Sequence, residues 1–283
     1  MSEKEIIPTV FPDIKTPKEL KLYLDDSLRR LDNSSYLYHY TTVSRVVDMI
    51  QSRTWHLGSA AGMNDRMEYK NGDPLRWNNL FFSCFMCEDK ESIGMWSMYA
   101  QPWEKGVKIS IPKKVVRTWI KKTTHLLEIS TQDYKPTERI IPVGKNGALL
   151  WISSVAYSNA DSMQEKKEAE KLTWSNQNNT NIQNAVRIPE LTGYIKDMAW
   201  SYEKETRIKA QFDNIYNVQR VAIPLTDDVI EAMTITASPL FEGDLLEEVS
   251  KQIEMSLNID KSIFTNRLNI TTPCQSCNFK KRK

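Results

Sequence analysis

The segment Trp200-Ser-Tyr-Glu-Lys-Glu-Thr-Arg207 places two carboxylates and a guanidinium at alternate positions. Side chains of a strand alternate between its faces, so a strand here would carry Glu203, Glu205 and Arg207 on one face, with the carboxylates about 6–7 Å apart. Such a pair suits sugar chemistry, because one carboxylate can stabilise an oxocarbenium-like transition state while the other orients a nucleophile. The alternative, which the spacing alone favours, is a solvent-facing strand with a ladder of Glu and Arg side chains.

Three further positions could contact a ligand. His39 lies within the predicted strand 36–40, where it can bind a ligand or serve as a core histidine that bonds to the backbone. Asn64-Asp65 follows a glycine-containing stretch and predicts either a plain turn or a substrate loop that closes over a cofactor. Tyr99 ends a predicted helix and can stack on a nicotinamide ring, although an aromatic residue in an apolar stripe is more often part of the core.

The four cysteines form two Cys-x-x-Cys pairs, Cys84/Cys87 and Cys274/Cys277, which together could complete a tetrahedral zinc site. The first pair begins in a predicted buried strand, where a three-residue offset points the two thiols to opposite faces. We therefore expect reduced, buried cysteines and no metal. The chain has neither a His-Glu-x-x-His motif nor a GxGxxG or phosphate loop, which disfavours a histidine-rich metal site, a Rossmann site and a nucleoside triphosphatase.

The elements that must position these residues alternate between strands and helices along the 283 residues. Strands are predicted at 36–40, 55–57, 80–86, 106–111, 200–212, 218–225 and 233–237, with several more within 125–157. Helices are predicted at 16–31, 43–50, 92–100, 162–175 and 243–257, with two more after Pro112 and Thr226, and 176–184 is a predicted loop. Because neither a repeat nor a long linker divides the chain, the prediction is one α+β domain with a mixed, largely antiparallel sheet and flanking helices.

Composition bounds the class of protein. Hydrophobic residues make up 40% and charged residues 26% of the chain, which permits a sizeable core and argues against disorder. No window approaches the roughly 18 apolar residues of a spanning helix, and the N-terminus lacks a basic region followed by an apolar stretch. We therefore expect a cytoplasmic protein without a membrane partner. The net charge is +2, but residues 280–283 are all basic, which indicates a solvated terminus or a phosphate-binding tail.

Taken in order, several segments resemble a bacterial family known mainly as a domain of unknown function. The resemblance spans residues 36–210 and rests on Tyr38-His-Tyr-Thr-Thr42, Trp55-His-Leu57, Asn64-Asp-x-x-Glu68, Phe82-Ser-Cys-Phe85, Met95-Trp-Ser-x-Tyr-Ala100, Gly106-Val107 and Trp200-Ser-Tyr-Glu-Lys-Glu-x-Arg207. The order of elements is also similar to the ADP-ribosyltransferase fold. That fold has a first strand carrying His or Arg, a middle strand with Ser or an aromatic residue, and a late strand with Glu.

The resemblance implies an enzyme that takes NAD as substrate. Glu205 would be the catalytic carboxylate, and Glu203 would position the acceptor. His39 would hold the NAD ribose and the nicotinamide amide, and either Tyr99 or Ser83 would take the middle position. The residues implied to contact NAD are His39, Tyr40, Thr41, Ser83, Tyr99 and Asn64.

The implied activity is transfer of ADP-ribose from NAD to a macromolecule, as a bacterial toxin or anti-phage defence effector with an antitoxin protein as a further partner. RNA is the first acceptor expected, because the run 43–50 also resembles nucleic-acid-modifying members of that superfamily. The domain would span 36–270, between an N-terminal helical segment at 1–35 and a basic Cys-x-x-Cys tail at 271–283. Two other classes remain open: a glycosidase or phosphodiesterase that uses Glu203, Glu205 and His39, and a non-catalytic module that binds RNA or protein.

Overall fold

The computed structural model describes residues 31–63, 79–88, 91–144, 147–158, 193–212, 218, 220–245, 247–249, 251 and 269–271. Their strands are β1 (Tyr36–Thr42), β2 (Thr54–Ser59), β3 (Leu80–Met86), β4 (Gly106–Pro112), β5 (His125–Ile129), β6 (Pro136–Pro142), β7 (Ala148–Ser154), β8 (Ala156–Ser158), β9 (Ile195–Asp197), β10 (Glu205–Phe212), β11 (Arg220–Pro224), β12 (Thr234–Ala237) and β13 (Asn269–Thr271). The helices are α2 (Val43–Ser52), α4 (Ile93–Tyr99), α5 (Lys113–Lys122) and α8 (Asp227–Ala232), with short 3-10 helices η2 (Ala60–Gly62), η4 (Trp103–Lys105) and η5 (Met198–Glu203).

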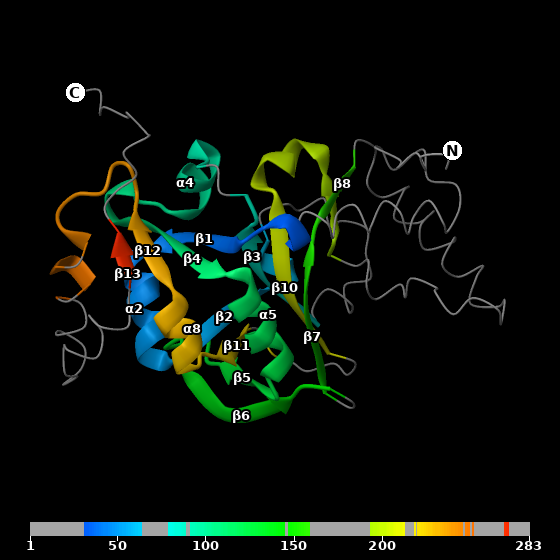
Figure 1. Ribbon diagram of the computed structural model, residues 1–283. Helices are drawn as coiled ribbons and strands as arrows, with labels where there is room; N and C mark the ends of the chain where they lie inside the picture. The colour runs from blue at the N-terminus through cyan, green and yellow to red at the C-terminus, as the bar shows by residue number, and fades with distance from the viewer. Residues whose placement is uncertain are drawn as a thin grey trace, which may run out of the picture.

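The strands form one large sheet and a separate parallel pair of β8 with β9 (Figure 1). The large sheet has the order β13-β12-β4-β1-β3-β2-β11-β5-β6, and β10 lies between β3 and β7. Its strand pairings are antiparallel except for that of β12 with β13. The predicted α+β fold with a largely antiparallel sheet is therefore confirmed.

Strand β3 is the point at which the sheet divides. One edge of β3 pairs with β10 along its whole length. The other edge is shared, because Met86 pairs with Tyr38 of β1 whereas Phe82 pairs with Gly58 of β2. Strands β1 and β2 therefore diverge between these two points, and helix α2, which connects them, covers the face of the sheet that carries the main core.

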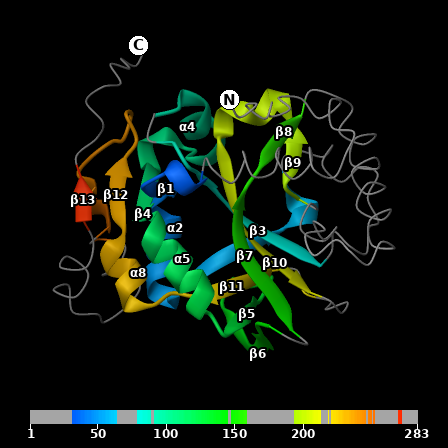
Figure 2. The same cartoon turned by 45° about the vertical axis from the view of Figure 1, so that its right-hand side comes forward.

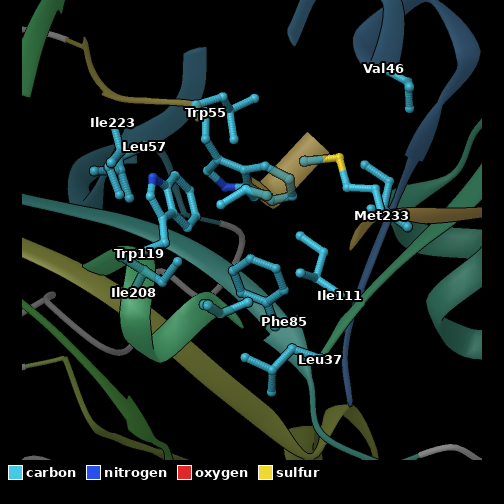
Figure 3. Close-up of a cluster of buried hydrophobic side chains, with 14 of the residues drawn as sticks. Leu37, Val46, Trp55, Leu57, Phe85, Ile111, Trp119, Ile208, Ile223 and Met233 are labelled. Atoms are coloured by element: carbon cyan, nitrogen blue, oxygen red, sulfur yellow. The ribbon is translucent and has the colours of Figure 1, made fainter. Parts of the chain in front are cut away.

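The main core lies between that face of the sheet and helices α2, α5 and α8 (Figures 1 and 2). Helix α2 forms because the run 43–50 repeats apolar residues at helical spacing, and it buries this stripe as predicted. Figure 3 shows Trp55 and Trp119 at the centre of the cluster, with Phe85 beside them. The rings of Trp55 and Phe85 stack with centroids 5.2 Å apart, and Trp119 meets Trp55 edge-on at 6.1 Å. These large side chains fix the relative positions of β2, β3 and α5.

One predicted strand is wrong at its beginning. Residues 198–203 form the 3-10 helix η5, and the strand β10 begins only at Glu205. Lys204 separates the two elements and adopts a left-handed backbone conformation, with φ of 44°, which turns the chain sharply. Glu203 and Glu205 are therefore not neighbours on one face of a strand.

The predictions for 1–30, 64–78, 159–192 and 272–283 lie outside the described residues, as does the end of the helix predicted at 243–257. The domain boundaries at 35/36 and 270/271 stay predictions. Among the helices that the structure describes, none has the length and the apolar composition required to cross a membrane.

Candidate active site

The alternation of side chains along the strands divides the predicted site residues between the two faces of the sheet. Tyr40 lies on the face that also carries Glu205, because Tyr38 and Glu205 both pair with Met86. His39 lies on the opposite face with the main core, as do Thr41 and Ser83, which pair with the core residues Val107 and Ile208. Asn64 lies outside the described residues.

Four buried charges meet where β9, η5 and β10 converge. Lys196 Nζ donates to Glu203 Oε2 at 2.5 Å and to Glu205 Oε2 at 3.3 Å. Arg207 Nε donates to Glu205 Oε1 at 2.6 Å, and its Nη2 donates to Oε2 at 3.0 Å. None of the four side chains is more than 4% exposed. The two carboxylates thus converge on one ammonium group, although they come from different elements.

Backbone contacts hold this ionic cluster in place. The Glu205 N–H donates to Tyr157 Oη at 2.7 Å, and the Val155 N–H donates to the Glu205 carbonyl at 2.9 Å. Arg207 Nη1 donates to the Gly193 carbonyl at 2.6 Å. Gly193 has φ of +80°, and a Cβ there would lie 2.4 Å from the Phe82 ring, so only glycine fits this position. The chain therefore closes tightly around Arg207.

Tyr99 reaches the same cluster from helix α4. Its hydroxyl donates to Glu203 Oε1 at 2.5 Å. Its ring packs against a small apolar group that includes Tyr40 and Trp96, whose rings meet edge-on at 4.8 Å. Figures 1 and 2 show α4 at the same end of the molecule as the short helix that precedes β10. Of the two candidates for the middle position, the geometry brings Tyr99 next to a carboxylate and leaves Ser83 across the sheet.

The environment pushes the pKa values of the two carboxyl groups apart. Burial raises the pKa of Glu205, but Arg207 and Lys196 outweigh this effect and lower it to about 2. Burial and then the charge of Glu205 raise the pKa of Glu203. Burial alone would lower the pKa of Lys196, yet the two carboxylates raise it overall. Glu205 is therefore the permanently charged member of the pair, and Glu203 accepts a proton more readily.

The two nearby cysteines, Cys84 and Cys87, form no disulfide. Burial and then the charge of Glu205 raise the pKa of Cys84. The Cys87 thiol donates to the Lys204 carbonyl at 3.0 Å. Both cysteines are free; Cys87 is buried, as predicted, whereas Cys84 is only partly buried.

His39 fills the gap between the diverging strands β1 and β2. Its Nδ1 lies 2.9 Å from the Cys84 carbonyl, and burial lowers its pKa, so the ring is neutral and Nδ1 carries the hydrogen. Trp55 Nε1 donates to Ser83 Oγ at 2.7 Å in the same gap. These contacts give His39 and Ser83 a role in holding the divided sheet together.

Lys196 is the site residue that sequence reasoning missed. It lies in a three-residue strand of the separate β8–β9 pair, and no periodic pattern surrounds it. The sequence signal for Arg207 was its spacing from Glu205, and the alternative interpretation of that spacing was a solvent-facing ladder. In the structure Arg207 is fully buried.

In comparisons with known proteins, the sequence similarity that the chain shows is confined to residues 95–208. No curated protein matches the chain. Among solved structures, DarT of Thermus sp. 2.9, determined in complex with carba-NAD+, matches with a TM-score of 0.30 and 12% sequence identity, covering 82% of this chain and 98% of that chain. A likeness this distant supports no argument about activity. Residues 95–208, which include Tyr99, Lys196 and both carboxylates, match the model of a family described as a protein of unknown function, DUF2971, and this confirms the predicted resemblance to such a family.

Proposed function

We propose that the protein is an ADP-ribosyltransferase that takes NAD as substrate on the face of the sheet that carries Glu205. The observation that supports this proposal is a buried carboxylate held ionised beside a second carboxylate and a tyrosine. When the bond between nicotinamide and ribose breaks, nicotinamide leaves with the bonding electrons, and positive charge develops on the ribose. A fixed negative charge in a dry environment stabilises that charge strongly.

The division of pKa values supports different roles for the two carboxylates. Glu205 stays ionised and would stabilise the oxocarbenium-like ribose. Glu203 would accept the proton that the acceptor nucleophile loses, and its bonds to Tyr99 and Lys196 would hold it in place. NAD bound here would lie on the other face of the sheet from His39, so this proposal does not include the contact of His39 with NAD that the family resemblance implies.

The acceptor that we propose is RNA, in a toxin or defence setting with an antitoxin partner. The support comes from the sequence: the resemblance of the run 43–50 to nucleic-acid-modifying enzymes, and the basic residues Arg267 and 280–283, which lie outside the described residues. Basic side chains attract phosphates, and this attraction weakens as salt rises.

The test offers labelled NAD and a mixed cell lysate to the full chain, and then treats separate aliquots with protease, ribonuclease and deoxyribonuclease. We expect label that ribonuclease removes and protease leaves. Label that only protease removes would mean a protein acceptor and would contradict the RNA proposal. The control is the double variant Glu205→Gln/Arg207→Met, which removes both charges of the buried pair. Absence of label with the wild-type chain, in lysates from several bacteria, would contradict the transferase itself.

A second function is favoured by the burial of the ionic cluster. Because Lys196, Glu203, Glu205 and Arg207 are all enclosed, the four charges could serve only to join β9, η5 and β10. The protein would then be a non-catalytic module that binds RNA or protein through other surfaces. Salt-sensitive RNA binding by the wild-type chain, with no consumption of NAD, would favour this function over the transferase.

A further inference from the structure

A cavity of about 1090 Å³ lies on the other face of the sheet from Glu205, and the proposed function makes no use of it. Strand β1, helix α2, strand β2 and the turn between β5 and β6 line it, and its lining includes His39, Thr41, Trp55 and His56. This volume is in the range of sites for small molecules. The cavity combines buried aromatic groups with charged groups at its rim, so its ligand should be partly aromatic and partly charged.

Tyr134 forms one wall of this cavity in a strained conformation. It belongs to the turn between β5 and β6, and its φ of 60° is left-handed, which is costly for a bulky side chain. The ring is 43% exposed and lies beside two guanidinium groups, with Arg220 Cζ 4.4 Å and Arg45 Cζ 5.8 Å from its centroid. An exposed aromatic ring beside two guanidinium groups suits a ligand that carries both an aromatic base and a negative charge, such as a nucleotide.

The charges around the cavity favour an anion. Arg45 and Lys135 line it, and Arg220 lies against the same tyrosine. Two aspartates also line it. The carboxylate of Asp133 accepts the Lys135 N–H within the turn, while Asp48 acts on His56 and raises its pKa. Burial comes first among the causes that lower the pKa of His56, and Arg45 and Arg220 add to it, so together they outweigh Asp48.

His39 supplies a hydrogen-bond acceptor to the same cavity. Its Nδ1–H is used by the Cys84 carbonyl, and the ring is neutral, so Nε2 keeps its lone pair. Among the described residues, Nε2 has no hydrogen-bond partner in the structure. A ligand that enters the cavity can therefore satisfy this nitrogen with an amino or hydroxyl group.

We propose that this cavity binds a nucleoside phosphate, with the base against Tyr134, the phosphate at Arg45 and Lys135, and an amino or hydroxyl donor to His39. The site is separate from the carboxylates, and the proposal does not depend on the transferase activity. Two sources share this chemistry: a free mononucleotide and the adenylate half of a dinucleotide such as NAD.

Calorimetric titration of the full chain with AMP tests the proposal, with adenosine, inorganic phosphate and NAD in parallel. Arg45→Met and Tyr134→Gly remove one cation and the aromatic wall, and glycine adopts the left-handed backbone without strain. The matched control is Arg117→Met, which removes an exposed arginine on α5 that pairs with Asp32 away from the cavity. We expect saturable AMP binding that weakens about fivefold or more in each cavity variant and not in the control.

Several results would overturn the proposal: no saturable binding of AMP up to millimolar concentration, equal AMP binding by all variants, or AMP binding only as tight as that of adenosine alone. Tighter binding of AMP than of NAD identifies the free mononucleotide as the source. The reverse order identifies the dinucleotide when Arg45→Met weakens NAD binding as well, because NAD is also the ligand proposed for the Glu205 face. Glu203→Gln should leave AMP binding unchanged, and loss of binding there would place the nucleotide at the carboxylates instead. Arg45 is exposed, so Arg45→Met should fold. If Tyr134→Gly does not fold, the AMP affinity of Arg45→Met alone tests the proposal.

Discussion

Arg207 binds both carboxylate oxygens of Glu205 through two nitrogen atoms, at 2.6 and 3.0 Å. The two residues lie on the same face of β10, and both are buried. The planar guanidinium matches the carboxylate, so the pair is held in one geometry. Loss of one partner from a buried pair leaves the other charge uncompensated, which makes the charge of Glu205 a matter of stability as well as of chemistry.

Glu205→Gln should therefore lower both activity and stability. The amide cannot stabilise the oxocarbenium ion, a loss that we expect to cost roughly 3–4 kcal/mol in transition-state free energy. It also removes the negative charge that compensates the buried guanidinium of Arg207, which we expect to cost about 3–5 kcal/mol in the free energy of unfolding. Urea unfolding and NAD turnover measure the two effects.

The double variant Glu205→Gln/Arg207→Met separates these effects. Removal of both charges should restore much of the unfolding free energy, because a buried pair can often be replaced by apolar groups at little cost. Turnover should stay at the level of the single variant. Restored turnover would show that Glu205 acts only through the fold.

The stability of the protein should fall below pH 4.5 because of Glu205. Its pKa in the folded protein is about 2, against an ordinary value of 4.5, so its stabilisation is present above 4.5 and is lost as the pH falls towards 2. Linkage sets this loss at roughly 3 kcal/mol. Glu203 has a raised pKa and acts in the opposite direction, since protonation of that group favours the folded state. Urea unfolding measures the free energy of unfolding from pH 7 to pH 3. This free energy should fall less in Glu205→Gln/Arg207→Met than in the wild type. Equal decreases would contradict the assignment of the acid loss to Glu205.

Tyr99→Phe should raise the pKa of Glu203 further. The Tyr99 hydroxyl bonds to the charged form of Glu203 and so favours ionisation, and phenylalanine removes only that hydroxyl. We expect a loss of about 1–3 kcal/mol in the free energy of unfolding. A titration by NMR of carbon-labelled glutamate, assigned with Glu203→Gln, measures the pKa. The control Tyr202→Phe removes a hydroxyl that donates to the Met98 sulfur, and it should leave Glu203 unchanged.

Much of the fold could be predicted because burial leaves a clear pattern in the sequence. Strand β3 forms at the predicted residues 80–86, since a continuous apolar run is typical of a strand buried on both faces. The prediction failed at 200–204, because alternation of aromatic and acidic residues imitates a strand. There the left-handed backbone of Lys204 and the contact of Tyr202 with helix α4 decide the structure. Neither has a signature in sequence spacing.

The site was less predictable than the fold, because its partners come together only through strand pairing. Lys196 and Glu203 are close in sequence, but they belong to the strand β9 and the 3-10 helix η5. The turn between these two elements has no signature in residue spacing. The face on which His39 lies depends on the register of β1 against β3 and β4, and a change of one residue reverses it. The contacts between these groups therefore depend on strand register and on turn geometry, which residue spacing does not determine.

The final prediction concerns the role of His39. Its contacts indicate a structural role, whereas the family resemblance implies contact with NAD. His39→Ala removes the donor to the Cys84 carbonyl. It also leaves a void beside Trp55 and Phe85, whose ring centroids lie 5.1 and 5.6 Å from that of the imidazole. We expect a loss of about 2–4 kcal/mol in the free energy of unfolding. His39→Asn keeps an N–H close to the position of Nδ1, so it should recover part of that loss. Urea unfolding of both variants, with NAD affinity measured on the folded fraction, distinguishes the two roles. Unchanged stability of His39→Ala with weakened NAD binding would contradict the structural role and support the contact with NAD.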